Sequence, residues 1–414
     1  MHRRTFLART GAALGAAALG PAAAGAGQGA TSTSRTSRQW TARTSGRIIV
    51  IGAGAFGGWT ALHLAESGME VVLVDAYGAG SARATSGGDS RGLRFAYGDR
   101  RMYTEMAIQA KTRWNDRQTQ WETGLMLTTG RISLYPESTP ALETIQDVLV
   151  EAGAEFELLT PEEIQRRWPQ MTVEGVEVGL FEPGATAIRA NTACRLIARK
   201  VEEAGGTLKI GQVEPPRGEG ILPGVQLREG GELHGDAFVF ACGSWLPALF
   251  PELLGDRISV PRRDVFFFGP PAGDPRFSFP HLPNFSEGSQ SVYGFPDLDG
   301  FGFKVAPFGG LDPFDPDRDE RVPAAHWLQR ARRYLALRFP GIMDQPLVHS
   351  RVCQLENTDD DHFIIDRHPA WENVWIAGGG SGHAFKHGPI LGEIVATRVQ
   401  GQDMVPEWSP HWAL

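Results

Sequence analysis

The sequence has little cysteine, no excess of positive charge and no long apolar run. Its three cysteines, Cys194, Cys242 and Cys353, are too few and too scattered for a disulfide framework or a zinc site. The formal net charge of −8 and the lack of a basic stripe argue against a nucleic-acid partner. With 414 residues, of which 42% are hydrophobic and 21% charged, the chain has the composition of a soluble globular protein with a sizeable core.

The first 45 residues are predicted to be a targeting segment and linker that take no part in the fold. Arg3 and Arg4 precede a weakly apolar stretch over residues 11–19, which is the pattern of a twin-arginine export signal, with a small-residue cleavage site at 24–26. The stretch is too short for a stable membrane span. The alternative is a disordered basic tail. The signal predicts export of the folded protein to the periplasm or the medium.

The segment from Arg47 to Asp75 carries the clearest motif. Residues 47–51 and 71–74 are apolar runs typical of buried strands, and residues 59–67 indicate a helix between them. Gly52, Gly54 and Gly57 form G-x-G-x-x-G, which permits a tight turn, close approach of a pyrophosphate and close helix packing. Asp75 ends the second strand, where it would bind ribose hydroxyls. This unit predicts a dinucleotide at the helix N-terminus but does not separate FAD from NAD.

Apolar runs elsewhere extend this pattern. They predict strands at 207–210, 237–241 and 374–377 and helices at 193–204 and 389–400. The stretch from 260 to 308 is rich in proline and aromatic residues and has β-like alternation, which indicates a separate antiparallel sheet.

Several downstream motifs resemble, in order and spacing, those of the sarcosine oxidase and N-methyl amino acid oxidase group of D-amino-acid-oxidase-like flavoproteins. These motifs are residues 85–94 with 96–98, 181–184, 293–296 with Lys304, 353–369 and 380–386. The resemblance implies an α/β fold with a doubly wound, Rossmann-like FAD-binding domain over 46–128, 182–252 and 345–405. An interleaved α+β substrate domain, built on a mostly antiparallel sheet, would cover 129–181 and 253–344.

The same resemblance implies roles for individual residues. Cys353 aligns with a cysteine bonded covalently to the flavin ring, and Lys304 aligns with a lysine that helps activate O2. Arg94 and Lys386 align with the pair that binds the substrate carboxylate. Arg91 and His383 would lie near the flavin ring, and Tyr293 would line the substrate cavity. The FAD contacts implied are Gly52, Gly54, Ala55, Phe56, Gly57, Asp75, Ser90, Arg91, Val213, Gly243, Cys353, Gly380, Gly382, His383 and Lys386; no metal is expected.

Three positions depart from the sarcosine oxidases, and they predict a larger or more apolar pocket that disfavours sarcosine itself. Gly87 and Phe308 stand in place of histidines, and Leu355 stands in place of a tyrosine. The expected reaction is oxidation of a secondary or N-methylated amino acid by hydride-type transfer to flavin. The imine is then hydrolysed, O2 is reduced to H2O2, and the enzyme is expected to be a monomer.

Three alternatives to this oxidase remain open. The first is a dehydrogenase that passes electrons to a quinone or carrier, against which Lys304 argues. The second is a hydrolytic or NAD-dependent enzyme. The third is a flavin-binding partner subunit without turnover, which the retained Arg94, Lys304 and Lys386 make less attractive.

Overall fold

The computed structural model of the chain describes residues 46–310, 312–402 and 412–414. The twin-arginine motif, its cleavage site and the linker lie outside these residues. Within the described part of the chain, no helix is long and apolar enough to cross a membrane.

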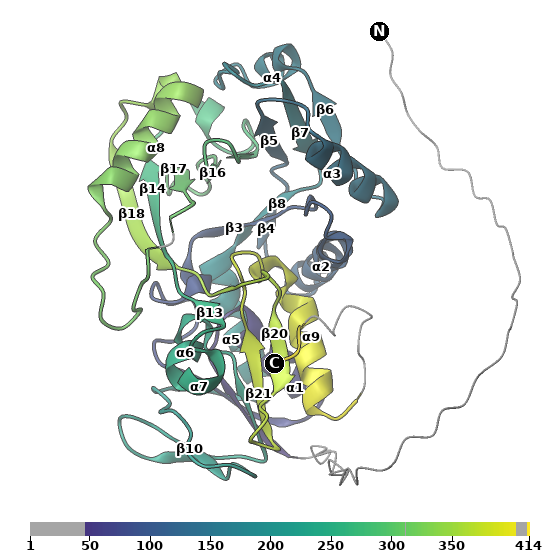
Figure 1. Cartoon of the computed structure of the whole chain (residues 1–414), viewed down its shortest axis with the longest axis vertical. Coiled ribbons are helices and arrows are strands. Elements are labelled where there is room, and N and C mark those ends of the chain that lie inside the picture. Colours follow the sequence, from purple (N-terminus) through teal and green to yellow (C-terminus); the bar gives the residue numbers. More distant parts are fainter. Residues whose placement is uncertain (1–45, 311, 403–411) are drawn as a thin grey trace, which may run out of the picture. The chain divides into compact units, whose positions relative to one another are not determined.

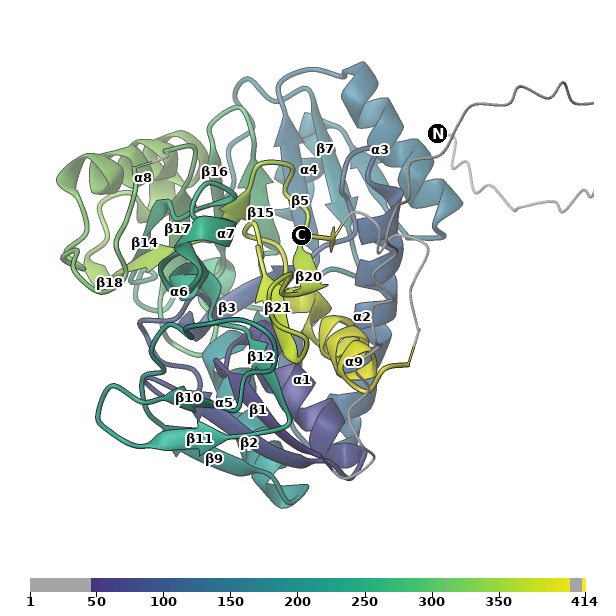
Figure 2. The same cartoon turned by 60° about the horizontal axis from the view of Figure 1, so that its bottom comes forward.

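A six-stranded sheet, whose strands are labelled in Figure 2, contains the predicted dinucleotide-binding unit. Five strands are parallel and one edge strand is antiparallel, which gives a Rossmann-like sheet. In spatial order the strands are β20 (Ile364–Arg367), β21 (Val374–Gly378), β12 (Ala237–Phe240), β1 (Arg47–Ile51), β2 (Glu70–Asp75) and β9 (Thr207–Ile210).

Alternate residues of the central strands pack into two separate cores. Ile48 and Val50 of β1 face a core shared with three helices, which Figure 2 shows beside the sheet. These helices are α1 (Ala55–Glu66), α5 (Ala190–Glu203) and α9 (Gly388–Val399). Ile49 and Ile51 face the other core, covered by the hairpin β10 (Gly224–Gln226) and β11 (Glu232–His234) and by short helices α6 (Leu246–Leu249) and α7 (Pro251–Leu254).

Helix α1 begins at Ala55, four residues earlier than predicted. The last glycine of the motif therefore lies in the first turn of the helix rather than in a loop before it. Gly52 has φ of +102°, and a Cβ there would lie 2.3 Å from the carbonyl oxygen of Ala241. A Cβ on Gly57 would lie 1.9 Å from the oxygen of Gly52. Both positions therefore require glycine, one for the turn and one for the helix–strand contact.

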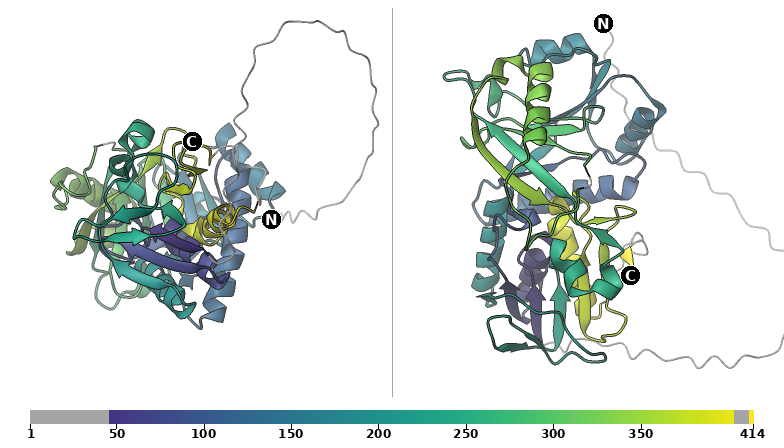
Figure 3. Two further views of the ribbon diagram at one scale, coloured as in Figure 1. Left: turned by 90° about the horizontal axis from the view of Figure 1, so that it is seen from below. Right: turned by 60° about the vertical axis from the view of Figure 1, so that its left-hand side comes forward.

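An eight-stranded sheet forms the second large layer. Its pairs are antiparallel except for β15 with β5. Helix α8 (Ala325–Arg338) packs on β14 and β17, as Figures 1 and 3 show in green. In spatial order the strands are β18 (Leu347–Gln354), β14 (Arg262–Phe268), β17 (Phe303–Pro307), β16 (Val292–Phe295), β15 (Asn284–Glu287), β5 (Arg131–Tyr135), β7 (Val178–Glu182) and β6 (Glu157–Leu159).

The domain boundary predicted at residue 345 does not coincide with the end of the eight-stranded sheet. The prediction assigns residues from 345 onward to the FAD-binding domain, but β18 pairs with β14 along the edge of the eight-stranded sheet. Cys353 near the end of β18 therefore comes from the second sheet.

A buried ion pair links α8 to β15 of this second sheet. Arg338 donates to Glu287 over 2.7 and 2.8 Å, and both side chains are only 2–3% exposed.

A three-stranded sheet and several further helices complete the fold. Strand β3 (Ser90–Leu93) pairs with β8 (Thr186–Arg189), which also pairs with β4 (Met126–Leu127), and the sequence did not predict this sheet. Helix α2 (Arg101–Gln120) packs on α9 and on α3 (Pro140–Glu151). Helix α4 (Pro161–Arg167) packs on β6 and β7, and β13 (Ile258–Ser259) pairs with β19 (Asn357–Thr358).

Candidate active site

A cavity of about 660 Å³ is lined by residues of all three of these sheets. Its size falls in the usual range for a cofactor or substrate site. Except for Gly57, which packs the helix against the strand, every residue predicted for the site lines it. Those that do are Gly52, Gly54, Ala55, Phe56, Asp75, Ser90, Arg91, Arg94, Val213, Gly243, Tyr293, Lys304, Cys353, Gly380, Gly382, His383 and Lys386.

The glycine-rich turn lies at one end of this cavity. The Asp75 carboxylate accepts hydrogen bonds from the backbone N–H of Ala53 at 2.8 Å and of Tyr77 at 2.9 Å, which fixes the turn to the end of β2. The N–H of Ala55, in the first turn of α1, donates to the Ser86 hydroxyl at 3.1 Å. Free N–H groups and the helix dipole favour an anion at this position. The turn, the acid and the cavity size fit the pyrophosphate and ribose of FAD.

Lys304 lies on β17 and is 3% exposed. Its Nζ donates to the Ser90 hydroxyl at 3.1 Å and to the Ser90 carbonyl at 3.2 Å, and it lies 4.8 Å from the centre of the Phe295 ring. Burial, with a further contribution from the charge of Arg91, lowers the pKa of Lys304 to about 7. A lysine in this state carries or releases a proton near neutral pH, and it lies inside the cavity wall.

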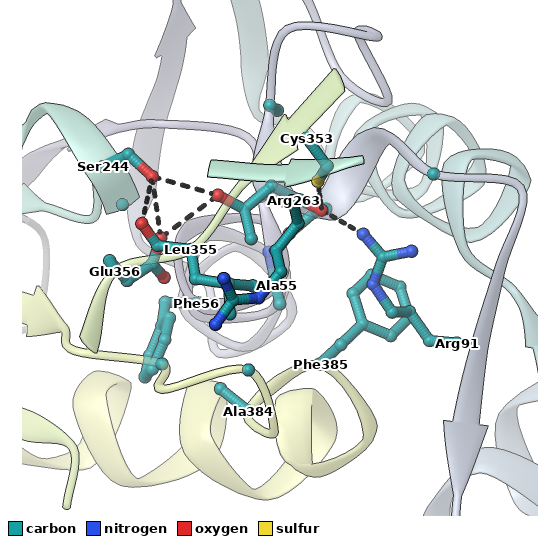
Figure 4. A pocket seen from close by; sticks show the side chains of 18 of the residues that line it. Ala55, Phe56, Arg91, Ser244, Arg263, Cys353, Leu355, Glu356, Ala384 and Phe385 are labelled. Atoms are coloured by element: carbon teal, nitrogen blue, oxygen red, sulfur yellow. Dashed lines mark hydrogen bonds between the residues drawn. The ribbon is translucent and has the colours of Figure 1, made fainter. Parts of the chain in front are cut away.

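Cys353 and Arg91 meet at one backbone oxygen. The Arg91 guanidinium donates to the carbonyl of Thr85, and the Cys353 thiol lies 3.9 Å from the same oxygen (Figure 4). Burial opposes ionisation of the thiol, but the charges of Arg351 and Arg91 outweigh it, so the pKa of Cys353 lies below its usual value. By contrast, burial raises the pKa of Cys242, the other cysteine that lines the cavity. Cys353 is thus the cysteine of this cavity that is favoured as a thiolate nucleophile.

Lys386 and Arg94 lie together on another wall of the cavity. The Lys386 Nζ donates to the Tyr97 hydroxyl at 2.5 Å and to the His383 carbonyl at 2.9 Å. The Arg94 guanidinium stacks 4.1 Å from the centre of the Tyr97 ring and donates to the Ala96 carbonyl. Burial, and then the charge of Arg94, hold the pKa of Lys386 well below its usual value. An arginine and a lysine at one site suit a carboxylate, whose negative charge favours the protonated form of the amine.

His383 lies in the turn before α9 and is kept neutral. Its Nε2 lies 2.9 Å from the Asp361 carbonyl, and burial together with the charge of Lys386 lowers the pKa of His383 to about 3. An imidazole with this pKa is a poor base at neutral pH. The placement therefore agrees with a supporting role rather than that of a general base.

The sequence did not single out Glu356, which lines the same cavity and is 6% exposed. Its Oε2 accepts hydrogen bonds from the hydroxyls of Thr85 at 3.2 Å and Ser244 at 3.4 Å (Figure 4). Burial raises the pKa of Glu356 to about 7. Glu356 follows Leu355 directly, but the hydroxyls that bind its carboxylate come from segments more than a hundred residues away, so no local pattern identifies it.

Two of the three departing positions face the cavity and one does not. Phe308 and Leu355 are part of the lining, as is Tyr293. Gly87 is not, because a Cβ there would lie 1.7 Å from the Ser81 carbonyl oxygen, so its backbone packs against the neighbouring chain. The expectation that Gly87 enlarges the pocket is therefore wrong. The described residues include no group of three or more His, Cys, Asp or Glu side chains that could hold a metal ion.

Comparison with known protein families identifies the fold. Residues 47–398 match the model of the DAO family of FAD-dependent oxidoreductases. The chain belongs to this family. The predicted FAD and the predicted fold class are thereby confirmed, and the chain is an FAD-dependent oxidoreductase. The hydrolytic and NAD-dependent alternatives are removed.

Individual relatives cover most of the chain. N-methyl-L-tryptophan oxidase of Salmonella dublin is 28% identical over 362 residues, which is 86% of this chain and 95% of that protein. The corresponding protein of Citrobacter koseri is 28% identical over 370 residues, 88% and 97% of the two chains.

Solved structures share the fold at lower identity. L-proline dehydrogenase from P. horikoshii has a TM-score of 0.75 at 20% identity and covers 87% of this chain and 95% of its own. Amadoriase I, the fructosyl amine:oxygen oxidoreductase of Aspergillus fumigatus, has a TM-score of 0.77 at 22% identity and covers 90% of each chain.

Proposed function

We propose that the protein is an FAD-dependent oxidase of secondary or N-methylated amino acids that reduces O2 to H2O2. The observation that carries this proposal is the convergence of Lys304, Cys353, Arg94 and Lys386 on the one cavity that also contains the glycine-rich turn. When bound in this cavity, FAD would supply the acceptor for the hydride equivalent of the amine and the donor of electrons to O2. The names of the N-methyl-L-tryptophan oxidase relatives support this substrate class.

Arg94 and Lys386, which both contact Tyr97, would position the substrate. Arg94 and Lys386 hold the carboxylate of the amino acid, which orients its carbon–nitrogen bond toward the interior of the cavity. Bound carboxylate raises the pKa of Lys386, because an opposite charge favours the protonated amine. The neutral His383 beside it does not compete for the carboxylate, and no residue of the cavity needs to act as an obligatory base when the amine is already unprotonated.

Lys304 supports oxidase over dehydrogenase activity. A buried cation, already desolvated, stabilises the negative charge that develops on oxygen as it is reduced. The TM-score with L-proline dehydrogenase reflects the fold alone, so it does not favour the dehydrogenase. The deciding experiment measures oxygen uptake and peroxide formation together, with the purified protein and a panel of N-methyl, cyclic and glycated amino acids. Substrate-dependent flavin reduction without peroxide would establish the dehydrogenase instead.

We also propose that the flavin is bound covalently through Cys353. The lowered pKa of this thiol and its place in the cavity support a thioether to the flavin ring. Acid precipitation of the holoenzyme should leave the yellow flavin with the protein, and the Cys353→Ser variant should release it into the supernatant. Cys242→Ser is the matched control, because Cys242 lines the same cavity while burial raises the pKa of its thiol. Release of flavin from the wild-type protein would refute the covalent bond.

Export by the twin-arginine route is the third proposal. It is supported by the Arg3-Arg4 motif, the weakly apolar stretch after it and the small-residue cleavage site. Replacing Arg3 and Arg4 with lysines in the producing cell should leave the protein in the cytoplasm, whereas equal amounts outside the cytoplasm for both proteins would refute it. Monomeric behaviour, expected from the resemblance, is checked by light scattering on the same preparation.

A further inference from the structure

A second cavity of about 450 Å³ shares a wall with the main one. Arg94, Arg131, Ser286 and His383 line both cavities, so a molecule held by Arg94 lies against this shared wall. Ser286 and Ser133, which also lines the second cavity, lie side by side with their hydroxyl oxygens 3.1 Å apart. The wall that the two cavities share is therefore polar.

Arg131, the first residue of β5, is partly exposed and, within the described part of the chain, lacks a hydrogen-bond partner for one buried atom of its side chain. Its Nε is buried and has no hydrogen-bond partner among the described residues. Its NH1 lies close to Gly92 on β3, since a Cβ on that glycine would be 3.9 Å away. A buried N–H donor without a partner is costly, and a guanidinium has further donors beside it. An anionic ligand at the shared wall would accept hydrogen bonds from them.

The charges around Arg131 do not balance. Its direct neighbour across the sheet is Glu182, which is fully buried and whose Oε1 accepts from the N–H of Phe95 at 2.5 Å and of Ala96 at 3.0 Å. Glu182 is the one carboxylate that raises the pKa of both Arg131 and Lys386, whereas the positive charge of Arg94 lowers the pKa of both. Two arginines and the amine of Lys386, whose pKa is lowered, thus share one carboxylate.

The remaining arginine of the second cavity does have a counter-charge. Arg100 lies 3.7 Å from the carboxylate of Asp361, and both residues line the cavity. Burial, and then the charge of Arg94, lower the pKa of Arg131 to about 10, as expected for a cation held among cations. The shared wall around Arg131 therefore carries more positive than negative charge, next to the pair predicted to hold the substrate carboxylate.

We propose that Arg131 forms a second anion subsite, so that the preferred substrate is an N-substituted amino acid that carries a second carboxylate. This inference rests on the proposed function for the first carboxylate at Arg94 and Lys386. The second carboxylate, on the side chain or on the N-substituent, lies at the shared wall, where Arg131 donates to it and a hydroxyl of the Ser286 pair adds a further hydrogen bond. An uncharged amide of the same shape leaves the guanidinium unmatched.

The first experiment measures binding to the holoenzyme by titration calorimetry, with glutarate and butyrate as unreactive probes. Glutarate should bind at least about 10-fold more tightly than butyrate, since a hydrogen-bonded ion pair is commonly worth that factor. The preference should disappear in Arg131→Met and remain in Arg131→Lys. Arg100→Met is the matched control and should keep it. Equal affinities for the two acids, or no binding of either, would overturn the proposal.

The second experiment compares the kcat/KM of N-methyl-L-glutamate with that of N-methyl-L-glutamine, each substrate measured by flavin reduction without oxygen. The acid should be favoured about 10-fold or more in the wild-type enzyme and not in Arg131→Met. Reduction by the amide or by apolar N-methyl amino acids with no preference for the acid would refute the second subsite alone. Selective glutarate binding without reduction by any amine would refute the proposed function and leave the anion subsite intact.

Discussion

Replacing Gly57 with alanine should abolish tight binding of FAD. The added Cβ would lie 1.9 Å from the carbonyl oxygen of Gly52 and 3.0 Å from the Ala241 Cβ. Side-chain carbons in real structures essentially never approach closer than 3.0 Å, so the helix and the turn must separate by about 1.1 Å. The atom in the way belongs to the backbone, which cannot swing aside as a side chain can.

The expected loss of affinity follows from this displacement. The N-terminus of α1 presents its N–H groups to the pyrophosphate, and a hydrogen bond of normal length that is stretched by about 1 Å is broken. A hydrogen bond to a charged group is worth about 1.5–3 kcal/mol, so each bond lost lowers the affinity for FAD by about 10- to 150-fold.

The assay uses apoprotein carrying Cys353→Ser, so that binding is reversible whether or not the wild-type flavin is covalent. FAD is titrated while the quenching of its fluorescence is followed. The control is Gly58→Ala, because a Cβ on Gly58 of the same helix would lie 3.4 Å from Ile197, an ordinary contact. That variant should bind FAD within about 3-fold of its parent, and alanine in a helix interior adds about 0.5–1 kcal/mol of stability.

The reasoning is wrong if Gly57→Ala binds FAD as tightly as Gly58→Ala does. The circular dichroism spectrum and melting temperature of the two apoproteins are compared first. A Gly57→Ala protein with a native spectrum and lost affinity supports the steric argument. Intact affinity refutes it, whatever the melting temperature.

Three further predictions concern buried charged groups. Lys304→Met should slow reoxidation of the reduced enzyme by O2 about 10²- to 10³-fold while changing the anaerobic reduction rate far less, and equal slowing of both half-reactions would remove its role. In the native enzyme, reoxidation should slow as pH rises past the pKa of Lys304, which is about 7 in the flavin-free cavity and higher beside reduced flavin. The pKa of Glu356 is raised from 4.5 to about 7, so its contribution to stability is present below pH 4.5 and is lost as pH rises through 7; urea unfolding of the apoprotein at pH 5 and 8 should show a loss of about 3 kcal/mol that Glu356→Gln lacks. Glu287→Gln should lower the free energy of unfolding by about 3–5 kcal/mol, because Arg338 is then buried without its ion-pair partner, and adding Arg338→Met should restore part of that loss. A double variant whose loss equals the sum of the two single losses would contradict this.

The βαβ unit was predictable because all its determinants are close in sequence. Strand, glycine turn, helix and terminal acid follow one another within the segment from Arg47 to Asp75, and each has its own local pattern. The start of α1 was misplaced because glycines normally argue against a helix. Here the close approach of helix and strand outweighs that preference at Gly57.

Features that depend on distant pairing could not be predicted. β18 carries mixed polar and apolar residues, and its partner β14 lies some eighty residues earlier, so its sheet is decided by tertiary contacts. The same holds for Arg131 and Glu356. Charged residues are usually exposed, and only the packing of remote segments around these two makes them part of the cavity wall.

The packing of α9 on α1 bears on how the protein is synthesised. Cβ atoms on Gly388 and Gly392 of α9 would lie about 2.5 Å from atoms of Trp59, so the last long helix fits directly against the helix that follows the glycine turn. Ribosomes add about 5–20 residues per second, so the first βαβ unit emerges roughly 15–65 s before its final covering. The nascent chain therefore lacks a complete cofactor site until translation is nearly finished, and truncation before α9 should leave a protein that cannot retain its flavin.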